Sequence, residues 1–148
     1  MKQMAARPVG YFWNFPHSQL YAEPARLAQL DLLSEEREAG GRRRRVYTLT
    51  ESGRQALDDW LREPTSEQPQ IRDTGLLKLF FGKGLSPDDL AALAHAQEQA
   101  HRARLTIYEA KAPEIEEPSH AATLRAGILF ERVFVDFWAE VAAGATRR

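Results

Sequence analysis

The sequence predicts a mainly α-helical fold that carries one small β-hairpin. Three observations lead to this prediction. Apolar residues recur at helical spacing along most of the chain. Two short segments with strand-forming residues flank Gly40-Gly41, a pair that can supply the backbone angles of a tight hairpin turn. A polar stretch with two prolines separates this region from a second, strongly apolar helical region.

The first predicted helix runs from Ser18 to Leu33. Ser18 is a suitable N-cap, and apolar side chains such as Leu20 and Leu27 recur on one face. Pro24 lies inside this helix. Because an interior proline removes a backbone donor and clashes with the preceding turn, we expect a kink or a later helix start there.

A hairpin and a second helix follow. Leu32 to Ala39 and Val46 to Leu49 are predicted strands, and Thr50 is a good N-cap for the helix that Pro64 closes. Trp60 lies on the apolar face of that helix, and we expect it to be a core residue that joins the helix to the next domain. Helix, β-hairpin, helix is the second half of a winged helix-turn-helix.

The C-terminal region predicts further helices. The apolar run Leu76–Phe81 ends at Gly82, and Ser86-Pro87 begins a helix that extends to about Ala110. The last helix, about His120 to Ala143, is apolar on more than one stripe. A surface helix needs only one such stripe, so we expect this helix to be covered on two sides, with a second subunit as the source.

Composition agrees with a chain of two domains. We assign residues 1–63 to the winged helix-turn-helix domain, 64–72 to a linker and 73–148 to a helical dimerisation domain. The net charge is −1, but residues 1–62 carry ten basic against eight acidic side chains, with the excess focused at 42–45. The chain has no cysteine and no apolar run of membrane-spanning length, so we expect a cytoplasmic protein with no membrane partner.

Several segments together resemble the PadR family of transcriptional regulators, the phenolic-acid-responsive repressors. The match covers roughly residues 9–142. It is carried by Gly10-Tyr11-Phe12-Trp13, His17-Ser18-Gln19-Leu20-Tyr21, Ala25-Arg26-Leu27, residues 42–50, Ser52-Gly53, residues 76–81, residues 101–105 and residues 123–127.

The resemblance implies a homodimer that binds two operator half-sites, with a recognition helix in the major groove and the wing on the backbone or minor groove. It also implies two helices before Gly10, where this sequence has nine residues. We therefore expect the first helix and most of the second to be absent, through a late gene start or a truncation. Weaker DNA binding, or an altered dimer that covers the gap, is the expected consequence. Pro24 and Asp31 also depart from the family, which has an unbroken helix and a glycine turn at these positions.

The resemblance places the recognition helix at about Ser18–Leu30. The predicted DNA-facing residues of the helix are His17, Ser18, Gln19, Tyr21, Glu23 and Arg26. The predicted DNA-facing residues of the wing are Arg42, Arg43, Arg44, Arg45 and Tyr47. Glutamine can contact adenine and arginine guanine in bidentate fashion, while hydroxyls and wing arginines suit phosphates or a narrow minor groove.

The predicted function is that of a PadR-like repressor that binds double-stranded operator DNA as a homodimer at the bacterial nucleoid. Two interpretations of the last helix stay open, a dimer interface, which we favour, and a pocket for a small aromatic effector. Both use Phe130, Phe134, Phe137 and Trp138. The alternative function is a protein-interaction or hydrophobic-ligand-binding module that no longer binds DNA.

Catalysis and metal binding are not predicted. The histidines at 17, 95, 101 and 120 lack the spacing of a metal site, and no nucleophile–base pair or phosphate-binding glycine loop is present. We therefore expect no enzyme activity, no catalytic residues, no metal and no cofactor.

Overall fold

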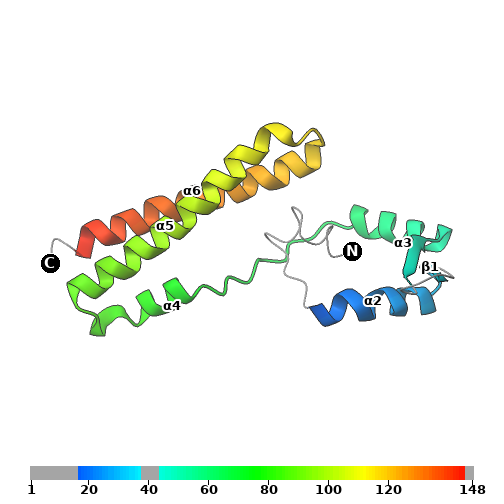
Figure 1. The fold of residues 1–148 in the computed structure, drawn as a ribbon, viewed down its shortest axis with the longest axis horizontal. Helices are drawn as coiled ribbons and strands as arrows, with labels where there is room; N and C mark the ends of the chain where they lie inside the picture. Colours follow the sequence, from blue (N-terminus) through cyan, green and yellow to red (C-terminus); the bar gives the residue numbers. More distant parts are fainter. Residues whose placement is uncertain (1–16, 38–43, 146–148) are drawn as a thin grey trace. The chain divides into compact units, whose positions relative to one another are not determined.

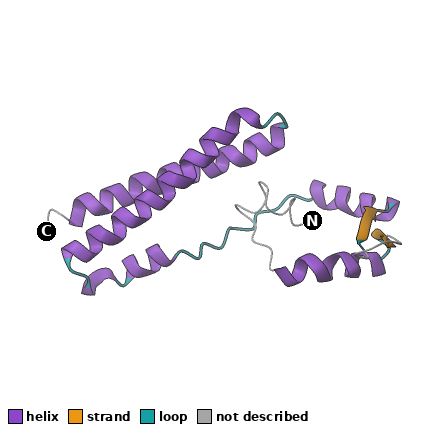
Figure 2. Cartoon of the chain, in the orientation of Figure 1, coloured by secondary structure: helices purple, strands orange, loops and turns teal. Residues whose placement is uncertain are grey.

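The structure is a computed structural model that describes residues 17–37 and 44–145. The chain divides into two compact units, Met1–Pro69 and Gln70–Arg148 (Figure 1). Helices dominate both, and one two-stranded antiparallel hairpin lies in the first unit (Figure 2). The predicted fold class, mainly α with a small hairpin, is confirmed.

The first unit contains helix, hairpin and helix in that order. Its elements are α2 (His17–Gln29), β1 (Leu33–Arg37), β2 (Arg45–Leu49) and α3 (Glu51–Arg62). Helix α2 begins at His17 and ends at Gln29, so Ser18 lies within the helix rather than capping it, and the predicted end at Leu33 was wrong. Pro24 lies inside α2, which rules out the later helix start.

β1 begins one residue later than predicted and β2 one residue earlier, and the predicted end of the first strand at Ala39 falls outside the described residues. Glu35 lies opposite Tyr47, and Arg37 lies opposite Arg45. The predicted turn at Gly40-Gly41 falls outside the described residues. Thr50 caps α3 as predicted, because its side chain accepts a hydrogen bond from the Gly53 amide at 3.0 Å.

The second unit consists of helices joined by short turns. They are α4 (Thr74–Phe80), η2 (Gly82–Gly84), α5 (Pro87–Lys111), η3 (Ala112–Glu114) and α6 (Pro118–Ala145). Ser86 caps α5 through its hydroxyl, which accepts from the Asp89 amide at 3.1 Å, with Pro87 at the first helical position as predicted. Helix α6 starts two residues before the predicted His120 and runs antiparallel beside α5 (Figure 1).

The core of the second unit lies between α5 and α6. Ala94, Trp138 and Ala142 are buried there, with half-buried leucines and phenylalanines packed around them. By contrast, Gly53 is the one buried residue among the described part of the first unit. The expectation that Trp60 is a core residue was wrong, since 68% of it is exposed. In residues 17–37 and 44–145, no helix combines the length and apolarity needed to cross a membrane.

Candidate nucleic-acid interface

The C-terminus of α2 is closed by a backbone motif centred on Asp31. The Leu32 amide donates to the Leu27 carbonyl at 3.0 Å, and the Asp31 amide donates to the Ala28 carbonyl at 3.1 Å. This is the Schellman pattern, which requires a left-handed residue after the helix. Asp31 supplies it with φ of 57°, although glycine is the usual choice. The chain therefore reverses sharply at Asp31 and enters β1.

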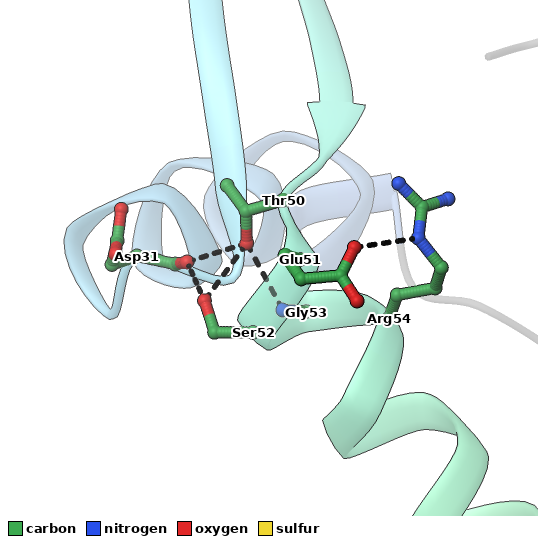
Figure 3. A network of polar contacts seen from close by, with 6 residues as sticks. All are labelled: Asp31, Thr50, Glu51, Ser52, Gly53 and Arg54. Atoms are coloured by element: carbon green, nitrogen blue, oxygen red, sulfur yellow. Dashed lines mark hydrogen bonds and ion pairs between the residues drawn. The ribbon is translucent and has the colours of Figure 1, made fainter.

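Two hydroxyls fasten this reversal to the start of α3 (Figure 3). Thr50 Oγ1 donates to the Asp31 carbonyl at 2.6 Å, and Ser52 Oγ donates to the same carbonyl at 2.7 Å. The Thr50 amide also donates to the Leu32 carbonyl at 3.2 Å. A helix end, a strand end and a helix start are thus held together by three hydrogen bonds.

Gly53 allows this junction to close. A Cβ atom built on Gly53 would lie 1.9 Å from the Leu32 carbonyl oxygen, far inside van der Waals contact. No residue with a side chain fits there without a shift of the backbone. Gly53 therefore lets the start of α3 pack directly against the chain segment that joins α2 to the hairpin.

Helix α2 presents polar side chains to solvent. Ser18, Gln19, Tyr21 and Arg26 are exposed, and Tyr21 is 70% exposed. Glu23 is half-buried and accepts a hydrogen bond from Arg26 Nε at 2.8 Å. This bond leaves the terminal nitrogens of Arg26 free to point elsewhere. The side chain of His17 lies outside the described residues.

The hairpin adds a basic surface to the polar surface of α2. Arg44 and Arg45 are exposed and Tyr47 is half-buried, while Arg42 and Arg43 lie outside the described residues. Tyr47 and Arg45 alternate along β2 and share one face of the hairpin.

Sequence reasoning missed two members of this hairpin surface. Glu35 Oε1 accepts from Arg37 Nε at 2.7 Å, and Glu35 Oε2 accepts from the Tyr47 hydroxyl at 3.0 Å. Arg45 Nη1 lies 3.7 Å from Glu35 Oε2. The hydrogen bond from Arg37, with help from Tyr47 and Arg45, lowers the pKa of Glu35 below its usual value. The strand pattern around Glu35 was visible in the sequence, but its partners depend on the register between the strands.

The four aromatic residues of α6 lie in different surroundings. Trp138 is fully buried within the chain, whereas Phe134 and Phe137 are half-buried. Phe130 is 43% exposed and stacks on Phe134 with ring centroids 4.5 Å apart. Of this group, Phe130 has the most surface to offer a partner or a ligand.

A buried polar pair lies beside these aromatics. His101 Nδ1 of α5 is 2.6 Å from Glu131 Oε2 of α6, and both side chains are almost completely buried. The ring of Phe134 lies 4.9 Å from that of His101. This pair was not singled out from the sequence, because two residues 30 apart meet only through helix packing. In the part of the chain that the structure describes, no three His, Asp or Glu side chains are grouped to hold a metal ion.

Helix α4 leaves apolar surface uncovered in the second unit. An open apolar groove of about 720 Å³ lies between α4 and α5, and its lining includes Leu77, Phe81 and Leu93. Phe80 and Phe81 are 81% and 70% exposed. Surface of this kind is typical of a protein–protein contact.

Two known families match the two units. Residues 1–59 match the Transcriptional regulator PadR-like family, and residues 71–144 match the family described as Virulence activator alpha C-term. The chain is 32% identical over 100 residues to the Negative transcriptional regulator PadR of Bacillus subtilis (strain 168). That alignment covers 66% of this chain and 55% of the relative, so it spans little more than half of that protein's length.

Solved structures share the fold. The crystal structure of Bacillus subtilis PadR in complex with operator DNA has a TM-score of 0.82 at 25% identity and covers 95% of this chain and 85% of that chain. The same protein in complex with p-coumaric acid has a TM-score of 0.81 at 24% identity, covering 98% and 87%. A PadR-like transcriptional regulator from Bacillus cereus has a TM-score of 0.81 at 14% identity, covering 99% and 87%, which is a likeness of fold alone.

Proposed function

The chain belongs to the PadR-like family of transcriptional regulators, and on this premise we propose that it binds double-stranded operator DNA as a homodimer and represses transcription. The observation that carries the proposal is the closed junction at Asp31, Thr50 and Gly53. It joins the end of an exposed polar helix to the end of an arginine-bearing hairpin through direct hydrogen bonds and close backbone contact. The structure of Bacillus subtilis PadR with operator DNA supports the same use of this fold.

In the proposed complex, α2 enters the major groove. Gln19 is exposed and can contact adenine, and the terminal nitrogens of Arg26 can contact guanine while its Nε stays bonded to Glu23. Ser18 and Tyr21 supply hydroxyls for phosphates. Specificity therefore resides in α2.

The wing supplies affinity that is independent of sequence. Arg44 and Arg45 are exposed, and guanidinium groups bind phosphates or enter a narrow minor groove. We propose that Arg42 and Arg43, next to them in the chain, add to this contact. Residues 1–63 form the DNA-binding domain of this proposal, 64–72 its linker and 73–148 its dimerisation domain.

A homodimer places two copies of α2 in successive major grooves. Half-sites are then separated by about 34–36 Å, one turn of B-DNA. The exposed apolar residues Phe80 at the end of α4, Phe81 just after it and Phe130 on α6 supply surface for the contact between protomers. A repressor of this kind acts in the cytoplasm, at the bacterial nucleoid.

Release from the operator is proposed to follow the binding of a small aromatic compound. Bacillus subtilis PadR has been solved with p-coumaric acid, and Phe130 offers an exposed ring stacked on Phe134. An effector shifts the balance between two states only if it binds one of them more tightly. We propose that the effector binds more tightly to the state in which the spacing between the two α2 helices no longer matches the operator.

Fluorescence anisotropy with labelled DNA from upstream of the gene tests the proposal. We expect tight binding that weakens steeply with salt. In a plot of log affinity against log salt concentration, the double variant Arg44→Ala/Arg45→Ala should flatten the slope by about one to two, because Arg44 is exposed while Arg45 also contacts Glu35. The matched control is Lys83→Ala/Arg125→Ala, which removes two exposed charges from the second unit and should leave the slope unchanged. Absence of salt-dependent binding by the wild type contradicts the proposal.

A further inference from the structure

Two arginines face each other across the hairpin. Arg37 of β1 is the direct cross-strand partner of Arg45 of β2, and more than half of each side chain is exposed. Like charges in this position destabilise an antiparallel pair. A nearby negative charge would offset the repulsion between the two guanidinium groups at this end of the hairpin.

Glu35 lies where it can offset this repulsion. It precedes Arg37 by two residues and so shares its strand face, and its side chain is only 19% exposed. Its two carboxylate oxygens are divided between the arginines: Oε1 accepts from Arg37 at 2.7 Å, and Oε2 lies 3.7 Å from Arg45. The Tyr47 hydroxyl donates to Oε2 at 3.0 Å and holds the carboxylate in place.

We infer that Glu35 is a positioning residue of the wing that competes with DNA phosphates for the guanidinium groups of Arg37 and Arg45. The inference rests on the proposed function. A phosphate that approaches either arginine must share or displace the Glu35 carboxylate, which carries the same charge and the same acceptor geometry. Glu35 thus restrains binding that is independent of sequence, so that the contacts of α2 dominate the choice of site.

The strand offers a matched control for this inference. Glu36 is the next residue, is exposed, and lies on the opposite face of the hairpin, across from Val46. Glu35→Gln and Glu36→Gln change the net charge equally and at nearly the same place. Glu35→Asp keeps the charge but shortens the side chain, so that the carboxylate no longer reaches both arginines.

The test measures the affinity for a random-sequence DNA duplex across a salt titration. We expect E35Q to bind roughly tenfold more tightly than E36Q at low salt, because two arginines are freed for phosphates. The slope of log affinity against log salt concentration should be steeper for E35Q by about one to two. E35D should change in the same direction by a smaller amount. In a background that carries Arg37→Gln and Arg45→Gln, E35Q should match E36Q.

Circular dichroism at the assay temperature checks that each variant is folded. If E35Q is unfolded, E35D decides: tighter and more salt-dependent binding than wild type supports the inference, and equal or weaker binding overturns it. If folded E35Q and E36Q coincide, the inference is wrong while the proposed function stands. If the wild type shows no salt-dependent binding to any duplex, the proposed function fails, and the inference fails with it.

Discussion

Substitution of Gly53 by alanine probes the junction that holds α2 against the hairpin. The added Cβ would lie 1.9 Å from the Leu32 oxygen, and contacts under 3.0 Å essentially never occur, so the two segments must separate by about 1.1 Å. Three hydrogen bonds cross this point, from Thr50 Oγ1 and Ser52 Oγ to Asp31 and from the Thr50 amide to Leu32. The substitution therefore forces apart the strand and helix ends that these bonds join.

The cost of this separation can be worked out from the contacts. Three hydrogen bonds at about 1 kcal/mol each amount to about 3 kcal/mol, and residual strain adds about 1–3 kcal/mol. Alanine is the better helix former by about 1 kcal/mol, and Gly53 is in α3, so part of the loss is recovered. We expect a net destabilisation of about 3–5 kcal/mol, a large part of the stability of a small domain.

Thermal denaturation followed by circular dichroism measures this effect. For a domain of this size we expect Tm to fall by at least roughly 12 °C, together with loss of DNA affinity above the new midpoint. Gly144→Ala is the control, because Gly144 is also helical but its Cβ would meet no atom within 4 Å. If Gly53→Ala melted at or above the wild-type temperature, as helix propensity alone predicts, the proposed role of the junction would be wrong.

Three further substitutions or conditions test other parts of the structure. Asp31→Gly should stabilise the chain by about 0.5–1 kcal/mol in urea denaturation, because glycine adopts the left-handed conformation without strain; a loss of stability would refute this. His101→Leu should cost about 3 kcal/mol by leaving Glu131 buried without its histidine, whereas the double variant His101→Leu/Glu131→Met should lie within about 1 kcal/mol of wild type; equal losses in both would contradict this account. Hydrogen bonds from the Ser119 hydroxyl and then the His120 amide lower the pKa of Glu117 from 4.5 to about 2. A depressed pKa adds stability above the usual pKa of the group, which is lost as the pH falls. The start of α6 should therefore fray between pH 4.5 and about 2, and an NMR titration that finds the ordinary Glu117 pKa would show the cap to be absent.

Local signals in the sequence were sufficient to predict the starts of α3 and α5. Thr50 and Ser86 are strong N-caps, and Pro87 suits the first position of a helix, so these boundaries depend on a few adjacent residues. Of the two outcomes expected at Pro24, the later helix start does not occur, because α2 already begins at His17.

Features that depend on contacts between distant residues were not predictable. A two-residue turn at Gly40-Gly41 would pair Glu35 with Val46, whereas the observed register pairs it with Tyr47. A shift of one residue moves every side chain to the other face, so the Glu35 cluster could not be found before the register was known. Trp60 was expected in the core because it lies on an apolar helix face, but such a face does not reveal what covers it.

The junction lies between these two cases. The sequence showed Asp31 where the family has a glycine, and it showed the pair Ser52-Gly53. It did not show why these residues occur together. The structure supplies the reason: the Asp31 carbonyl accepts both hydroxyl bonds, and Gly53 leaves the space that these bonds require. Asp31 and Gly53 both lie where the start of α3 contacts the connection between α2 and β1, and residues so far apart in the sequence form no local pattern.

Selection of bound duplexes from a random DNA library tests the central claim most directly. If two copies of α2 read successive major grooves, the wild type should enrich an inverted repeat with half-site centres about 10 base pairs apart. Gln19→Ala/Arg26→Ala should lose that enrichment while it keeps salt-dependent binding to random DNA, because the wing is unchanged. Failure of the folded wild type to enrich any sequence would contradict the account.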